Sequence, residues 1–332
     1  MTGKPQGSML VMALWMLSLL GLFSISLGFG VRQKAALLNR LSTLDAVYPI
    51  AYSGVELAKS LVRTDDNFDV DIFTDTWASG SQKRELDGGS FSLGTDGPSP
   101  VVDEERKVNL NHTSAEVLGR LLQRVSGLDR DEAEALGYNL QDWMDSDSFF
   151  GHPQHGAEDS YYDGLPLPYA AKDAAYETLD ELLLVKDMTE QVFGKIRPYV
   201  TVYGSGKVNL NTAGRQVLSA LGFSEAAVQA IVQYRAGADG QEGTGDDSFF
   251  SSPGSIESAL EQAGTPLDVS QVVFLSGLMA ADSVGVVSTV FSVQSVGIAA
   301  RNGAQVDVEA FFDRKGRTLY QRAGEVRWPA RS

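Results

Sequence analysis

The fold of this 332-residue chain is decided near its N-terminus, by the apolar run Ser8-Met-Leu-Val-Met-Ala-Leu-Trp-Met-Leu-Ser-Leu-Leu-Gly-Leu-Phe23. No charged residue lies between Lys4 and Arg32. A helix needs roughly 20 apolar residues to cross a bilayer, so residues 8–31 are long enough for a transmembrane helix. Apolar residues then recur at helical spacing from Ala35 to Leu61. This spacing predicts a second, amphipathic half of the same helix over residues 32–64.

Three interpretations of this N-terminus compete. A cleaved secretory signal has an apolar core of about 7–15 residues, which is shorter than this run. A plain membrane anchor fits the length. In the third interpretation, residues 1–7 are a leader that is cut between Gly7 and Ser8, so that the mature chain begins with its apolar helix. Basic residues after the run would place the large domain in the cytoplasm, but this rule is weak for one span before a long acidic domain.

The composition indicates a globular protein with a strong negative charge. Hydrophobic residues make up 43% of the chain and charged residues 21%, and the formal net charge is −16. This charge disfavours binding to nucleic-acid phosphates or anionic lipid surfaces, which need Lys and Arg, and is compatible with divalent cations. The chain has no cysteine, which excludes disulfides, cysteine-based zinc sites and thiol catalysis.

An internal repeat begins at Lys107. The pentapeptide Lys107-Val-Asn-Leu-Asn111 returns at residues 207–211, and each copy continues into two helical stretches joined by a glycine turn. Each copy then reaches the tripeptide Ser-Phe-Phe, at 148–150 and 248–250. The repeat predicts duplicated helix-hairpin-helix (SAM-like) units in an all-helical block, residues 104–280. The expected helices are 114–122, 130–144, 178–185, 189–196, 213–221, 225–235, 255–263 and 269–278.

Residues on both sides of this block alternate with the period of two that is typical of strands. Buried-type residues from Val306 to Phe312 alternate with mostly polar ones, and Asn302-Gly303 is a strong hairpin signal. The expected strands are 68–73, 84–86, 90–93, 286–296, 305–313 and 318–328. We therefore expect an α+β fold in which the long helix packs on an antiparallel sheet from residues 65–103 and 281–332, with the helical block inserted.

Two acidic loops are candidate cation sites. Asp145 and Asp147 lie two residues apart, as alternate ligands do in calcium loops, and Glu158 and Asp159 could complete the shell. In the second copy the corresponding loop holds a second possible set: Asp239, Glu242, Asp246 and Asp247. For both loops calcium and a plain solvated loop remain open interpretations. Oxygen ligands on flexible loops favour calcium over magnesium or zinc.

The sequence offers little for catalysis and a weak case for nucleic acid. Ser, His and Asp occur without a nucleophile motif, so we do not expect an enzyme. Residues 208–213 and 231–235 resemble the competence-type membrane-anchored DNA receptors. However, the turns at 126–129 and 221–224 replace the Pro-Gly-Ile-Gly typical of such hairpins, and Asp129 would repel a phosphate. We expect no nucleic-acid partner.

The order of these parts resembles the minor pseudopilins of the K class from type II secretion systems (general secretion pathway protein K). The resemblance extends over nearly the whole chain. Residues 7–8, 107–111, 142–147 and 156–162 carry it, together with 182–188 and 198–200. Most pilins have Glu five residues into the mature chain, where this sequence has Met12; the K class looks similar in lacking that Glu.

The resemblance implies a non-enzymatic structural subunit. Prepilin peptidase would cut it at Gly7–Ser8 and methylate Ser8, and residues 8–31 would hold it in the inner membrane by a single pass, with the C-terminal domain in the periplasm. It would cap the tip of a periplasmic pseudopilus with the I- and J-class pseudopilins. The family's calcium site would carry over to Asp145, Asp147, Glu158 and Asp159. We also expect partner contact along residues 35–61.

Overall fold

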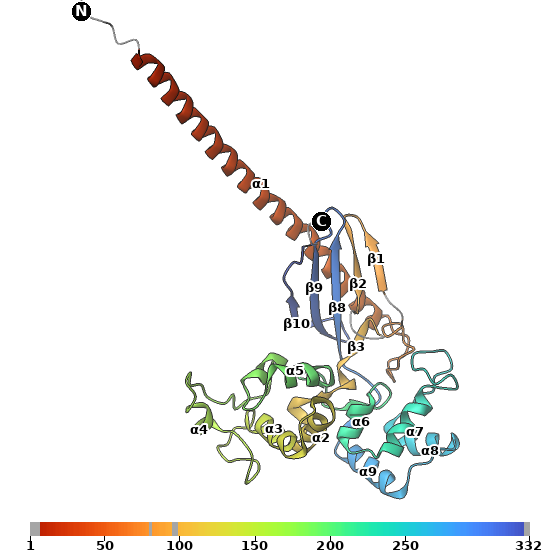
Figure 1. The fold of residues 1–332 in the computed structure, drawn as a ribbon. Coiled ribbons are helices and arrows are strands. Elements are labelled where there is room, and N and C mark those ends of the chain that lie inside the picture. The colour runs from red at the N-terminus through yellow and green to blue at the C-terminus, as the bar shows by residue number, and fades with distance from the viewer. Residues whose placement is uncertain (1–6, 80–81, 95–98, 329–332) are drawn as a thin grey trace, which may run out of the picture.

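The protein is described here by a computed structural model that covers residues 7–79, 82–94 and 99–328. Its dominant feature is α1, Gly7–Arg63, a helix of 57 residues that continues through Pro49. The N-terminal half extends away from the body of the protein (Figure 1), with its apolar side chains exposed. Among the described residues, α1 is the one helix long and apolar enough to cross a membrane.

The lower end of α1 packs on an antiparallel sheet with strand order β1-β2-β8-β9-β10, and β3 pairs with β8 beyond the end of β2 (Figure 1). A long helix with an antiparallel sheet confirms the expected fold class at this level. The strands are β1 Gln82–Leu86, β2 Gly89–Leu93, β3 Val101–Asp103, β8 Val290–Ala299, β9 Gln305–Asp313 and β10 Thr318–Ala323.

The core between helix and sheet follows from two periodicities. One face of α1 buries Val47, Ala51, Val55, Ala58 and Val62, while β9 buries alternate residues from Val306 to Phe312. Gly54 allows the closest approach, because a Cβ there would lie 2.1 Å from Ser295 Oγ on β8. From Val47 onward, the apolar face of α1 is therefore occupied by the protein's own sheet. Of the expected partner-contact surface over residues 35–61, Leu37, Leu38 and Leu41 remain exposed.

The segment expected as a strand at 68–73 is irregular, so that prediction was wrong. Its backbone groups pair elsewhere: Asp71 N donates to Val286 O at 2.8 Å, and Ile72 N donates to the Asp75 carboxylate at 2.9 Å. At the other end, the expected strand 286–296 begins only at Val290, and the strand expected to reach Trp328 ends at Ala323.

The helices of the insert lie below the sheet, at the end farthest from the N-terminus (Figure 1). Side-chain caps begin several of them: Asp129 Oδ1 accepts from Glu132 N at 2.9 Å, Ser224 Oγ from Ala227 N at 3.2 Å and Asp268 Oδ1 from Gln271 N at 3.0 Å. The α-helices are α2 Ala115–Ser126, α3 Arg130–Asp142, α4 Asp159–Tyr162, α5 Glu190–Ile196, α6 Arg215–Leu221, α7 Glu225–Arg235, α8 Ile256–Gln262 and α9 Val269–Ala280. The helix expected at 178–185 is a 3-10 helix, Leu179–Leu184.

The two copies of the repeat make the same hydrogen bonds. Asn111 donates to Tyr176 O at 3.0 Å and accepts from Tyr176 N at 2.7 Å, and Asn211 does the same to Phe250 at 3.0 and 2.8 Å. Each copy is also closed by a two-residue parallel bridge, so the block is not entirely helical. These bridges are β4 (Val108–Asn109) with β5 (Val200–Thr201), and β6 (Val208–Asn209) with β7 (Val284–Gly285).

This pairing corrects the alignment of the copies. The tripeptide at 248–250 ends in Phe250, which is fully buried against Tyr234, whereas Phe150 is 56% exposed. Tyr176 takes the place of Phe250 in the first copy. The first copy thus carries a longer loop between its second helix and this anchoring residue, and that loop contains the first acidic candidate site.

Candidate metal centre

The loop after α3 is folded around Asp142, the last residue of that helix. The Asp142 carboxylate accepts hydrogen bonds from Gly151 N and Ala157 N, both at 3.1 Å. Gly156 has φ 132°, and a Cβ there would lie 2.2 Å from Asp142 Oδ2, so this position requires glycine. Asp142 thereby brings the two ends of the loop together. Asp142 was not among the predicted ligands, and its role in shaping the loop was not predicted from the sequence.

Three of the four predicted ligands converge in this loop. Asp145, Asp147 and Glu158 each offer a carboxylate oxygen within 4.8 Å of the others. Asp145 Oδ1 and Glu158 Oε1 are buried and have no hydrogen-bond partner. An ionised oxygen without a donor is costly in a buried place, and a hard cation would satisfy it. The donor set is all oxygen, which fits calcium.

The electrostatics of this cluster favour a cation in the same way. Burial raises the pKa of Glu158 to about 7, and repulsion from the carboxylates of Asp142, Asp145, Asp147 and Asp173 adds to the shift. Burial, followed by repulsion from Asp147, also raises the pKa of Asp145. The carboxylates therefore hold protons more tightly than free ones do, because little positive charge balances them.

Asp159, the fourth predicted ligand, does not join the cluster. Its carboxylate accepts from Ala171 N at 2.8 Å, which ties the start of α4 to the following segment. It therefore shapes the loop while Glu158 faces the other carboxylates. A pair of adjacent acidic residues gives no indication in the sequence of which one turns inward.

The second predicted set does not converge within the described residues. Glu242 pairs with the buried guanidinium of Arg235, which itself donates to Leu210 O and Ala213 O. Asp246 accepts from Ala238 N, Asp239 N and the Thr244 hydroxyl, and these hydrogen bonds lower its pKa. Asp247 accepts from Gly243 N, and Asp239 from Gln241 N. These carboxylates already have partners inside their own loop.

The backbone amides at the glycine turns between the paired helices also have hydrogen-bond acceptors within the protein. In the first copy, Leu128 N donates to Ser126 Oγ and Asp129 N to Glu132 Oε2. In the second copy, Ser224 N donates to Gln271 Oε1 at 3.0 Å. Amides that are bonded in this way are not available to a phosphate.

The predicted processing site lies at the edge of the described residues. Gly7 is the first residue of α1 and Ser8 follows within the helix. The rest of the expected leader, residues 1–6, lies outside the described residues.

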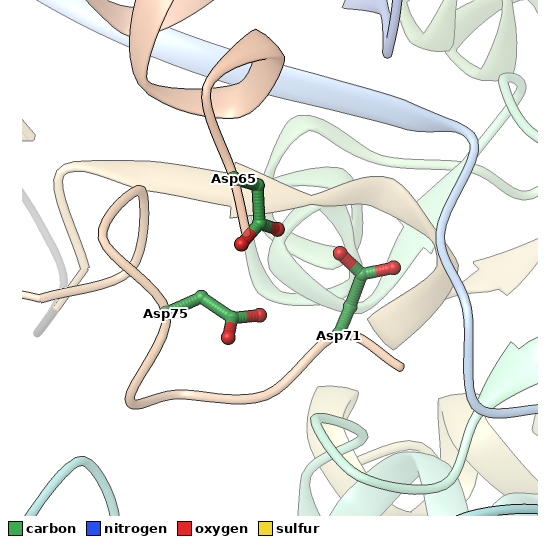
Figure 2. Close-up of side chains that lie close together, drawn as sticks. All are labelled: Asp65, Asp71 and Asp75. Atoms are coloured by element: carbon green, nitrogen blue, oxygen red, sulfur yellow. The ribbon is translucent and has the colours of Figure 1, made fainter. Parts of the chain in front are cut away.

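A further carboxylate cluster, which was not predicted from the sequence, is formed by Asp65, Asp71 and Asp75 in the irregular segment after α1 (Figure 2). Burial raises the pKa of Asp71 to about 7 and that of Asp75 to about 6, even though Arg314 acts in the opposite direction. These three residues are separated by six and four positions in the sequence, which matches neither the period of a strand nor the ligand spacing of a known metal-binding loop. The one signal in the sequence was the density of Asp between residues 65 and 75.

Comparisons with known proteins bear on the insert and on the overall fold. Residues 99–205 match the family model described as type II secretion system (T2SS), protein K. Type II secretion system protein K of Pectobacterium carotovorum subsp. carotovorum is 30% identical over 142 residues, which cover 40% of this chain and 42% of that protein. The protein of the same name from Aeromonas hydrophila is 36% identical over 83 residues, 24% of this chain and 25% of that protein. The chain thus spans less than half the length of these curated relatives.

The fold is similar to that of a solved chain. It comes from the crystal structure of the GspK-GspI-GspJ complex from the enterotoxigenic Escherichia coli type 2 secretion system. The TM-score is 0.66 at 18% identity, and the match covers 86% of this chain and 98% of that chain. At this identity, the likeness concerns the fold alone.

Proposed function

The resemblance to protein K of type II secretion systems is confirmed over residues 99–205, and on that premise we propose that the chain is a minor pseudopilin with a structural role in protein secretion. One observation carries this proposal. An exposed apolar helix of membrane-spanning length continues without a break into the core of an antiparallel sheet. This arrangement lets one element serve as a membrane anchor before assembly and as a packing element within a filament.

We propose that the chain is cut between Gly7 and Ser8 by prepilin peptidase, and that Ser8 becomes the methylated N-terminus. The helix over residues 8–31 then holds the subunit in the inner membrane, with the folded domain in the periplasm. The length and apolar character of α1 support the anchor. The apolar N-terminal half of α1 is not buried against the rest of the protein, so its side chains are free to contact lipid.

The proposed position is the tip of the pseudopilus, with I- and J-class pseudopilins as partners. Three observations support it. The chain has Met12 where most pilins carry a Glu, so it lacks the charge that would pair with the N-terminal amine of a subunit above. The similar solved chain comes from the GspK-GspI-GspJ complex, in which GspK is bound to two further components of the type 2 secretion system. The insert also makes the subunit wider than α1 and the sheet alone (Figure 1).

We further propose that the two copies in the insert are duplicated helix-hairpin-helix units and that the first binds calcium through Asp145, Asp147 and Glu158. The equivalent hydrogen bonds of Asn111 and Asn211 support the duplication. The buried oxygens of Asp145 and Glu158, which have no hydrogen-bond partner, support the ion. Calcium at this place would fix the long loop of the first copy, whereas the second copy holds its shorter loop with its own hydrogen bonds.

Mass spectrometry of the N-terminus tests the proposal. Full-length protein expressed with a prepilin peptidase should begin at methylated Ser8, and the same protein expressed without the peptidase should retain residues 1–7. Replacing Gly7 with a bulky residue, in Gly7→Val, should block the cut, while Gly3→Val serves as a matched control within the leader. A mature chain that still begins at Met1, or that begins near Phe29, would contradict the proposal.

A further inference from the structure

Three carboxylates meet where α1 ends and the chain turns towards the sheet. Figure 2 shows Asp65, Asp71 and Asp75 pointing towards one another from the irregular segment after the helix. Each offers an oxygen within 4.8 Å of the other two. Asp71 is fully buried and Asp65 is 6% exposed, so the group is largely shielded from water.

The backbone fixes each carboxylate in place. Asp71 Oδ2 accepts from Ser288 N at 2.6 Å, and Asp75 Oδ2 accepts from Ile72 N at 2.9 Å. Asp65 accepts from Asn67 N through Oδ1 alone, at 3.4 Å. These contacts orient the side chains while leaving carboxylate lone pairs directed at the common centre.

The positive charge around the cluster is too small to balance its three carboxylates. Within the described part of the chain, Arg314 is the cationic side chain that pairs with it: the guanidinium hydrogen-bonds Asp71 and lies 3.6 Å from Asp65 Oδ2. Asp103, also fully buried, adds repulsion on Asp71. Three carboxylates in the cluster and a fourth behind it therefore face a single guanidinium.

Unpaired polar atoms point to a ligand at the same place. Asp65 Oδ2 has no hydrogen-bond partner, although its side chain is only 4% exposed. Two buried donors lie beside this oxygen without a hydrogen bond of their own: Arg314 Nη1, at the ion-pair distance of 3.6 Å from Asp65 Oδ2, and the indole N–H of Trp77, near the Asp65 and Asp75 carboxylates. Both are N–H groups, so they contact the carboxylates or bound water and cannot be ligands of a cation. A water molecule alone would satisfy hydrogen bonds but would leave the excess negative charge. A hydrated divalent cation would do both.

We propose that Asp65, Asp71 and Asp75 bind a divalent cation of the calcium type. Carboxylate oxygens held by an irregular backbone suit calcium, which accepts flexible coordination, better than magnesium, which demands octahedral geometry. The ion would fasten the end of α1 to the segment that leads from the insert into β8, through the contact of Asp71 with Ser288. This site is separate from the one in the loop after α3 and does not depend on the proposed function.

Calcium and terbium binding to the full-length protein in detergent test the proposal. The variant Asp145→Asn/Asp147→Asn removes the other candidate site and is the background for every measurement. This background should still bind calcium, raise its melting temperature on calcium addition, and show terbium luminescence under tryptophan-selective excitation, because Trp77 lies beside the cluster. Adding Asp75→Asn should weaken calcium binding by ~10-fold or more.

Asp69→Asn is the matched control, because Asp69 is an exposed residue of the same segment. This substitution removes the same charge as Asp75→Asn does. It should leave calcium binding unchanged. Equal weakening by Asp69→Asn and Asp75→Asn would overturn the proposal, since a general charge effect would then explain the result. If Asp75→Asn fails to fold, the background variant alone decides: calcium that neither binds nor raises its melting temperature also overturns the proposal.

Discussion

Arg314, in the turn after β9, donates hydrogen bonds to the carboxylate of Asp71, 243 residues earlier in the chain. The same guanidinium donates to Ser288 O and stacks over the ring of Phe291 at 5.0 Å. One side chain thus joins the segment after α1, the exit from the insert and the last hairpin of the sheet. The junction between the helix, the sheet and the insert is polar at this point, in contrast to the apolar cores on either side.

Breaking this pair should strongly destabilise the protein. Arg314→Met leaves the buried Asp71 carboxylate without its cation, which costs ~3–5 kcal/mol in the free energy of unfolding. Denaturant unfolding in a chelator would measure it. Arg317→Met is the control, because its partner Asp313 forms an exposed pair worth at most about 1 kcal/mol. Adding Asp71→Asn to Arg314→Met should restore part of the loss; no restoration would contradict the pairing.

The Asn side chains of the repeat should matter unequally. Asn211→Ala leaves the N–H and C=O of the buried Phe250 unpaired, at ~1–3 kcal/mol for each group. Asn111→Ala leaves the same groups of Tyr176 unpaired, but the Asn111 site is more exposed, so we expect a smaller loss. Hydrogen exchange should show faster exchange of the Phe250 amide in Asn211→Ala. Equal losses would show that burial does not set the cost.

Without calcium, stability should fall as pH rises from about 4.5 to 7. Burial raises the folded-state pKa of Glu158 to about 7, so the folded protein binds more protons than the unfolded chain over this range. Deprotonation therefore favours unfolding. Thermal melts in a chelator should show the decline, and Glu158→Gln should reduce it. In saturating calcium the wild-type trend should weaken or reverse, because the ion binds the ionised carboxylate.

The exposed leucines of α1 should mediate assembly. Leu37 and Leu41 are 58% and 46% exposed, whereas the apolar face from Val47 onward is already buried on the sheet. Leu37→Asp/Leu41→Asp should reduce co-purification with I- and J-class pseudopilins by at least ~10-fold without lowering the melting temperature of the folded domain, because apolar contact area lost to a partner is replaced by charge. Leu167→Asp, at an 83% exposed leucine of the insert, is the control.

The protein should not bind DNA. The Glu132 carboxylate accepts from Asp129 N of the first glycine turn, the Asp129 carboxylate caps Glu132 N in α3, and the chain carries a net charge of −16. We expect no retention on a DNA column at low salt. Retention that weakens as salt is raised would instead support the competence-type receptor.

Local patterns in the sequence were sufficient to predict a helix or strand where that element has one buried face. The alternation from Val306 to Phe312 predicted β9 with its bounds, Gln305–Asp313, and the spacing after Ser224 predicted α7 over Glu225–Arg235. The apolar run from Ser8 likewise predicted a helix of membrane-spanning length. In each case the period of the side chains is imposed by a single local conformation, so no distant contact is needed to read it.

Contacts between distant segments decided the rest. Tyr176, which lies outside the repeated Ser-Phe-Phe tripeptide, takes the position equivalent to Phe250 because it meets Asn111 across 65 residues. Glu158 turns towards the other carboxylates and Asp159 away, and Glu242 is taken by Arg235. Asp65, Asp71 and Asp75 come together because Ser288 and Arg314 hold their irregular segment. The sequence determined which elements form and which residues are acidic. Only tertiary structure decided which acidic residues face one another, because that depends on the backbone and side-chain partners each carboxylate meets in the folded chain, from Arg235 seven residues before Glu242 to Ser288 on the far side of the insert from Asp71.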